Sequence, residues 1–151
     1  MQERRVNTRG IIFKNGMLFA QQLKANSGPN QFWSTPGGGL DPNESLTTGL
    51  HREMIEETGI APVIGKLLFI QQFNDGKREQ LEFFFHITNA DDYDVIDLSK
   101  TSHGEIEIEA NQFIDPKRER LLPAFLTEID IAEYIETDIP VLVMSELFSA
   151  A

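Results

Sequence analysis

The sequence predicts a single domain that mixes helices and strands, an α/β (α+β) fold, and three patterns support this prediction. Asn15-Gly16 separates two apolar segments and is typical of the turn of a β-hairpin. Residues 45–58 carry apolar side chains four residues apart, which indicates an amphipathic helix. Residues 81–87 are apolar on both faces of an extended chain, as expected for a central strand that is covered on each side.

The first half of the chain is predicted to hold a hairpin, a loop and a helix. Segments 10–14 and 17–21 form the strands of the hairpin, and residues 25–32, which are rich in Asn, Ser, Gly and Pro, form the loop. The helix is expected to run from Ser45 to Thr58, with Asn43 or Ser45 as its N-cap and Gly59 at its end.

The second half is predicted to hold a further hairpin, a loop, two short strands and a helix. Segments 67–73 and 80–88 flank an Asp75-Gly76 turn and form the hairpin. Residues 89–104 are polar and predict a surface loop, whereas residues 105–109 alternate Glu and Ile, as a strand with one buried face does. Apolar residues between positions 122 and 132 predict an amphipathic C-terminal helix with Pro123 in its first turn. Residues 141–144 predict a last short strand.

The composition limits the class of protein. The 151 residues suit one domain, 1–151, because no segment resembles a linker. Cysteine is absent, which excludes thiol chemistry and cysteine-ligated zinc and agrees with a cytoplasmic location. The net charge of −11 argues against a nucleic-acid-binding surface, since such binding relies on Lys and Arg. No apolar run reaches the roughly 20 residues of a membrane helix, so no membrane partner is expected.

Three carboxylates stand close together near the end of the predicted helix. Glu53, Glu56 and Glu57 are three and four residues apart, so they share one helix face. Carboxylates gathered in this way repel one another unless a positive charge lies among them. Oxygen ligands of this kind suit Mg²⁺, so the sequence predicts a divalent-cation site behind the glycine-rich segment 37–39.

The segment 38–60 resembles the signature of the Nudix hydrolases. Its nine specified positions are all filled at the required spacing: Gly38, Glu44, Arg52, Glu53, Met54, Glu56, Glu57, Gly59 and Ile60. More loosely, Trp33 and Pro36-Gly37 lie where the family often has an aromatic residue and a Pro-Gly pair. The resemblance implies an αβα sandwich with a mixed central sheet. It also implies hydrolysis of a nucleoside diphosphate linked to another group, with Mg²⁺ or Mn²⁺ as cofactor.

The resemblance also implies roles for individual residues. Glu53, Glu56 and Glu57 correspond to the metal ligands, together with the backbone carbonyl of Gly37. Either Glu53 or Glu56 polarises the attacking water, and Arg52 orients the carboxylates. Two further residues support the site: Gly38 lets the chain approach the metal, and Glu44 either anchors the loop through Arg52 or reaches the metal through water.

The substrate is less well determined than the chemistry. The chain lacks the extra residues that often mark Nudix hydrolases of ADP-ribose, dinucleoside polyphosphates, coenzyme A or NADH, which leaves nucleoside triphosphates, oxidised ones included, as the favoured substrates. An ADP-ribose or nucleotide-sugar pyrophosphatase and a non-catalytic nucleotide-binding regulator are the alternatives. Dimers are common in the family, so a homodimer is compatible with the resemblance, but the sequence does not determine the oligomeric state.

Several residues are left open at this point. Some Nudix hydrolases add an acid from a distal loop, and here that acid would be Glu105, Glu107 or Glu109. The three histidines are too scattered to suggest a site and are expected to be structural. The residues that contact the substrate are not determined by the sequence, which offers four candidates: Arg9, Lys24, Phe73 and Phe84.

Overall fold

The computed structural model describes residues 3–147, and its centre is a five-stranded sheet, called here sheet A. The strands follow the order β10-β6-β7-β1-β5, with β1–β7 and β10–β6 parallel and the other two pairs antiparallel. Sheet A is therefore a mixed sheet. Its members are β1 (Arg4–Ile11), β5 (Gly37–Gly39), β6 (Ile64–Asn74), β7 (Glu79–Ile87) and β10 (Leu142–Glu146).

A smaller second sheet, sheet B, packs against one face of sheet A. Its strands follow the order β2-β3-β4-β9, and β8 pairs with β3 along most of its length. Its members are β2 (Phe13–Lys14), β3 (Met17–Leu23), β4 (Trp33–Ser34), β8 (Ile108–Ile114) and β9 (Leu121–Leu122).

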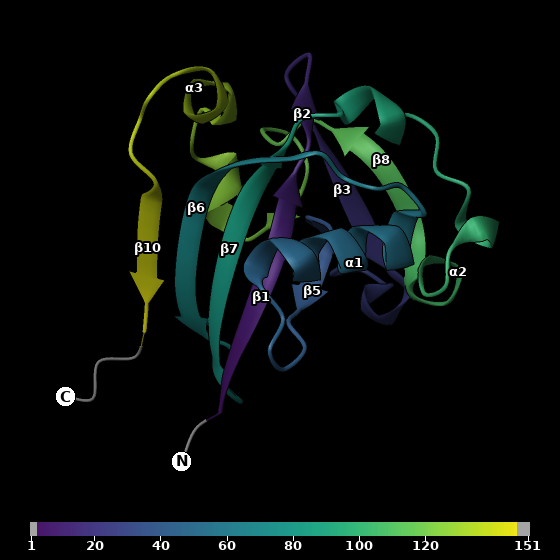
Figure 1. Cartoon of the computed structure of the whole chain (residues 1–151), viewed down its shortest axis with the longest axis horizontal. Coiled ribbons are helices and arrows are strands. Elements are labelled where there is room, and N and C mark those ends of the chain that lie inside the picture. The colour runs from purple at the N-terminus through teal and green to yellow at the C-terminus, as the bar shows by residue number, and fades with distance from the viewer. Residues whose placement is uncertain (1–2, 148–151) are drawn as a thin grey trace.

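The helices lie on both sides of this pair of sheets. The long helix α1 crosses the face of sheet A at β1 and β5, whereas α3 lies above the upper end of β6 (Figure 1), where its Tyr134 contacts Phe69. No helix within residues 3–147 is long and apolar enough to cross a membrane. The α-helices are α1 (Leu46–Thr58), α2 (Gly104–Glu107) and α3 (Ile131–Glu136), and the 3₁₀ turns are η1 (Lys24–Asn26), η2 (Ala90–Tyr93), η3 (Leu98–Lys100) and η4 (Ala124–Thr127).

Two hydrophobic cores hold these layers together. Leu50 and Met54 of α1 are fully buried against Phe85 and Ile87 of β7, which forms the core under the helix. On the other face of sheet A, Phe69 lies in edge-to-face contact with Phe84 and Phe125, with ring centroids 6.1 and 5.5 Å apart. Because β7 contributes to both cores, its residues are apolar on both faces, as the sequence predicted.

Most of the predicted elements are confirmed. The Asn15-Gly16 turn joins β2 to β3, and residues 75–78 join β6 to β7. The helix runs over Leu46–Thr58 with Ser45 as its N-cap, the short strand near residue 141 is β10, and β7 is an inner strand of sheet A. The order of these layers agrees with the predicted αβα sandwich.

Three predictions about local structure are wrong in part. Residues 105–107 form one turn of helix in α2, and the strand begins only at Ile108; Ile106 is 73% exposed, so its alternation with Glu is not that of a half-buried strand. The expected helix over 122–132 is divided into η4 and α3, since Asp130 caps a new helix at Ile131. Residues 10–11 belong to β1 of sheet A rather than to the first hairpin, because Gly10 and Ile11 pair with β7.

Candidate active site

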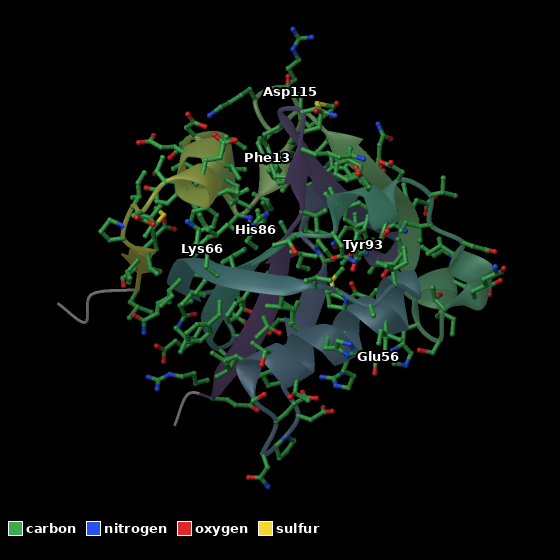
Figure 2. All side chains as sticks on the ribbon, turned by 45° about the horizontal axis from the view of Figure 1, so that its top comes forward. Phe13, Glu56, Lys66, His86, Tyr93 and Asp115 are labelled. Carbon is green, nitrogen blue, oxygen red and sulfur yellow. The ribbon has the colours of Figure 1, made fainter. Side chains whose placement is uncertain are left out.

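Helix α1 presents the predicted catalytic residues, among them Glu56 (Figure 2), and its ends are fixed by local interactions. The Ser45 side chain accepts a hydrogen bond from the Thr48 N–H, which caps the first turn. At the other end Gly59 adopts φ +75°, a left-handed conformation that glycine accepts readily, and its N–H bonds to the Ile55 carbonyl. With both ends set, the helix buries Leu50 and Met54 and directs Glu53 and Glu57 toward strand β5.

Strand β5 consists of three glycines that allow this close approach. A Cβ atom on Gly38 would lie 2.7 to 2.9 Å from the carboxylate atoms of Glu53, so a side chain there would displace the carboxylate. Gly37 has φ +134°, and a Cβ at this position would meet the Thr8 carbonyl oxygen of β1. The glycines therefore position the helix carboxylates directly against the backbone of β5.

Arg52 donates hydrogen bonds to three of the acids in this region. Its Nε and Nη2 donate to the two oxygens of Glu44 at 2.8 and 2.9 Å, while Nη1 donates to Glu53 at 3.1 Å and to Glu56 at 3.2 Å. Nη2 also donates to the Gly39 carbonyl at 3.1 Å. The guanidinium group beside Glu44 lowers the pKa of that carboxyl to about 2. Arg52 thus contacts both carboxylates that it was predicted to orient, and it binds Glu44 across the connection between β5 and α1.

Three acids of the signature segment 38–60, Glu53, Glu56 and Glu57, are called here the box carboxylates, and Glu57 is the most deeply buried of them. Its oxygen Oε2 accepts a hydrogen bond from the Gly37 N–H at 3.3 Å, and the residue is 7% exposed. Burial raises the pKa of Glu57 to about 8, and the positive charge of Arg9 acts in the opposite direction. Burial also raises the pKa of Glu53. For both carboxyl groups, burial outweighs the effect of the neighbouring arginines. A cation in the adjoining cavity would therefore be favoured, because it stabilises their charged forms.

All three box carboxylates line one acidic cavity of about 550 Å³ between α1, β5 and β1. Its walls combine acids with three arginines, so it offers ligands for a cation and positive groups for phosphate. The residues that line it are Arg5, Arg9, Gln21, Leu23, Ser34, Thr35, Gly37, Gly38, Gly39, Asp41, Arg52, Glu53, Glu56, Glu57, His103 and Glu107.

The chemistry of this donor set fits Mg²⁺ or Mn²⁺. Carboxylate and carbonyl oxygens are the ligands that Mg²⁺ takes in proteins, and the buried carboxyl of Glu57 gains from a nearby positive ion. As the side chains stand within residues 3–147, no three acids or histidines converge closely enough to hold an ion. Arg52 holds Glu53 and Glu56, and the Gly37 carbonyl accepts from Arg9 at 3.2 Å. Metal binding would therefore require these side chains to rotate away from their present partners.

A loop after β7 brings His103 and Glu107 to the same cavity. The His103 N–H donates to the Glu56 carbonyl at 3.0 Å, and its ring nitrogen Nδ1 lies 3.1 Å from Oε2 of Glu56. His103 therefore lies on the cavity wall beside Glu56, although the scattered histidines of the sequence suggested no site. Of the three acids considered from this loop, Glu107 lines the cavity, whereas Glu105 and Glu109 do not. The helical turn α2, rather than a strand, decides which acid faces inward.

A second cavity of about 420 Å³ adjoins the acidic one and shares Arg9, Ser34 and Thr35 with it. It lies between the two sheets and combines aromatic with polar side chains. Phe73 lines it, whereas Phe84 is fully buried in the core and Lys24 lines neither cavity. The remaining residues that line it are Phe32, Gln71, Glu82, Leu122, Pro123, Ala124 and Glu146.

Arg5 and Arg9 both line the acidic cavity, but the sequence alone does not identify Arg5 as part of a site and leaves the role of Arg9 open. Both lie on β1 four positions apart, so they share a face of the strand with Asn7. This period of two is readable in the sequence, but the sequence does not state what the face with Arg5 and Arg9 meets. Only the pairing of β1 with β5 places that face beside Gly37 and Gly39.

Comparison with known proteins assigns the family. The family model described as the NUDIX domain matches residues 3–128, which is most of the chain. The chain belongs to the Nudix family. The Nudix signature occupies α1 and β5 with their connection, so the residues of the match that carry chemistry are those on the wall of the acidic cavity.

Individual Nudix relatives agree with this assignment. The chain is 32% identical to the putative 8-oxo-dGTP diphosphatase of Bacillus subtilis over 97 residues, which cover 62% of each protein. It is 36% identical to the RNA pyrophosphohydrolase of Pasteurella multocida over 66 residues, 42% of this chain and 31% of that protein. The alignments thus span 31% to 62% of the length of these relatives. The solution structure of the E. coli ORF135 protein has the same fold, with a TM-score of 0.69, 20% identity, and coverage of 92% of this chain and 96% of that one.

Proposed function

We propose that the protein is a Mg²⁺-dependent or Mn²⁺-dependent pyrophosphohydrolase that cleaves a nucleoside diphosphate linked to another group. Nucleoside triphosphates, oxidised ones included, are the favoured substrates, with a nucleoside monophosphate and pyrophosphate as products. The observation that carries the proposal is the placement of Glu53, Glu56 and Glu57 on the wall of a cavity that also contains arginines. The relatives named as diphosphatase and pyrophosphohydrolase support the same reaction class.

The box carboxylates, the Gly37 carbonyl and the arginines on the cavity wall would each have a task in this reaction. Glu53, Glu56 and Glu57, with the Gly37 carbonyl, would hold the metal, which would supply electrostatic stabilisation of the charge that develops on the phosphate oxygens. Glu53 or Glu56 would accept a proton from the attacking water. Arg52 fixes the directions of both carboxylates, while Arg5 and Arg9 on β1 would bind the phosphate oxygens of the substrate.

A hydrolysis assay with a panel of substrates tests this proposal. The panel contains the common nucleoside triphosphates, 8-oxo-dGTP, ADP-ribose and a dinucleoside polyphosphate, each with Mg²⁺, with Mn²⁺ and with EDTA. We expect metal-dependent release of monophosphate and pyrophosphate, with the highest kcat/KM for a triphosphate. If ADP-ribose gave the highest kcat/KM, it would take the place of nucleoside triphosphates as the proposed substrate. Binding without any turnover would favour the nucleotide-binding regulator.

A matched pair of variants assigns the activity to the box. Glu53→Gln removes one carboxylate from the cavity wall, whereas Glu109→Gln removes one from the exposed surface outside the cavity. We expect the first to lower kcat by at least about 100-fold and the second to leave it unchanged. Equal activity in the two variants would contradict the proposed site. The cytoplasmic location and the homodimer are further proposals, and light scattering of the purified protein tests the second.

A further inference from the structure

The inner face of sheet A changes from apolar to polar along its length. On β6, β7 and β1, alternate residues share this face and pair across the strands. At one end Phe69, Phe84 and Ile11 belong to the hydrophobic core. At the other end the same face carries Gln71, Glu82 and Arg9, which line the second cavity. Polar side chains here do not contribute to the core.

Gln71 and Glu82 lie directly opposite each other on neighbouring strands. Their Cα atoms are partners in the antiparallel β6–β7 pair, so their side chains run next to each other into the cavity. Gln71 is 6% exposed and Glu82 is 5% exposed. The two side chains have equal length, so their polar ends lie side by side and are largely shielded from solvent.

The hydrogen bonds of the two side chains are incomplete. Oxygen Oε1 of Gln71 is buried and accepts no hydrogen bond from any residue in the range 3–147. Arg9 donates to Oε2 of Glu82 at 3.0 Å, which leaves Oε1 for a second donor. Asn7 also has an unpaired buried oxygen, but it does not line the cavity. Buried acceptors without donors cost free energy, and a ligand that supplies the donors recovers it.

We propose that Gln71 and Glu82 select a nucleobase that carries an exocyclic amino group, a proposal that rests on the nucleotide pyrophosphohydrolase function above. An amino group supplies N–H donors to two neighbouring acceptors, whereas a carbonyl in its place would face the Glu82 carboxylate and repel it. Phe32 and Phe73 line the same cavity and offer aromatic surface to the base. Arg9, Ser34 and Thr35, which line both cavities, connect this base site to the acidic one.

Nucleotide pairs that differ in the amino group test the selection. GTP and ITP differ by the 2-amino group of the purine, and CTP and UTP differ by amino or carbonyl at position 4. We expect kcat/KM for the amino-bearing member to exceed that of its partner by about 10-fold to 100-fold in both pairs. Ratios within twofold in both pairs would overturn the proposal.

A variant assigns the selection to Gln71. Gln71→Leu keeps the size of the side chain and removes the unpaired acceptor, and we expect it to lower both ratios toward one. Gln72→Leu is the matched control, because Gln72 lies on the opposite face of the same strand, where its side chain contacts Glu79 and Ser145. The control should keep the wild-type ratios. A Gln71→Leu protein that kept them as well would contradict the assignment. Glu82 is less suitable for the test because Arg9 links it to Thr35 and Gly37.

Binding measurements separate this proposal from the proposed function. Calorimetric Kd values for GTP and ITP in EDTA report base recognition whether or not the protein hydrolyses either nucleotide. A preference for GTP without turnover would reject the hydrolase and keep the base selection. Turnover with equal kcat/KM and equal Kd for the two nucleotides would keep the hydrolase and reject the base selection.

Discussion

Glu44 and Arg52 form a two-pronged ion pair, with both carboxylate oxygens bound at 2.8 and 2.9 Å, across the connection between β5 and α1. The same guanidinium group uses Nη1 for Glu53 and Glu56. Arg52 therefore couples the conformation of the loop to the direction of two box carboxylates. This coupling explains physically why an arginine, with its planar fork of donors, occupies the position.

Replacing Arg52 by Lys should impair both activity and stability. A lysine ammonium group cannot bind Glu44 with two parallel bonds while it also orients Glu53 and Glu56. We expect kcat to fall by at least about 10-fold, and the free energy of unfolding to fall by about 1 to 3 kcal/mol. Steady-state kinetics and urea unfolding measure the two effects. Full activity in Arg52→Lys would show that the orientation by Arg52 is unimportant.

Glu57 should make the stability of the metal-free protein depend on pH. Its folded pKa of about 8 lies above the ordinary 4.5, so the folded state binds the proton more tightly than the unfolded chain. The stabilisation is complete below pH 4.5 and is lost as pH rises to about 8. Each pKa unit corresponds to about 1.4 kcal/mol, so we expect a loss of up to about 5 kcal/mol over this window.

The Glu57→Gln variant removes this titration and serves as the comparison. In EDTA its free energy of unfolding should change less between pH 5 and pH 8 than that of the wild type. At pH 8, Mg²⁺ should stabilise the wild type more than the variant, because the cation compensates the buried carboxylate. The variant should also lose hydrolytic activity while keeping its fold. Identical pH profiles of unfolding in the two proteins would contradict the raised pKa.

Gly37→Ala and Gly38→Ala should have different effects although they are neighbours. A Cβ on Gly37 would meet backbone atoms of β1 at a φ of +134°, so we expect a loss of stability of about 1 to 3 kcal/mol. A Cβ on Gly38 would meet only the end of the Glu53 side chain, which can move. Gly38→Ala should therefore fold with nearly normal Tm but have a reduced kcat. Thermal unfolding and kinetics on both variants distinguish these outcomes, and the reverse order of effects would refute the description of β5.

His103→Ala should weaken activity without unfolding the protein. The ring is half-exposed and contacts Glu56, whereas the backbone bond from residue 103 to α1 does not depend on the side chain. We expect about a 10-fold rise in the Mg²⁺ concentration needed for half-maximal activity, with Tm unchanged. His51→Ala, on the exposed side of α1, provides the control. If both variants required the same Mg²⁺ concentration for half-maximal activity, His103 would have only a structural role.

Local sequence was enough to predict the elements whose determinants lie within a few residues. The Asn15-Gly16 turn, the Ser45 cap, the Gly59 end and the spacing of Leu50 and Met54 are all short-range signals. They specify helix α1 and the face that carries its carboxylates. For segment 105–109, the local alternation was misleading, because residues 104–107 form a helical turn in which Ile106 is exposed, and the backbone of His103 ties the start of this turn to α1.

The sequence by itself thus determined the Nudix signature, the carboxylate face of α1 and the class of chemistry, because these depend on spacing along one helix. Only the tertiary structure decided which other groups join them. Arg9, Gln71 and Glu82 are brought together by the pairing of β1, β7 and β6, although Arg9 and Glu82 are 73 residues apart in the chain. The periodicity of a strand reveals which residues share a face, but strand order and register decide what that face meets.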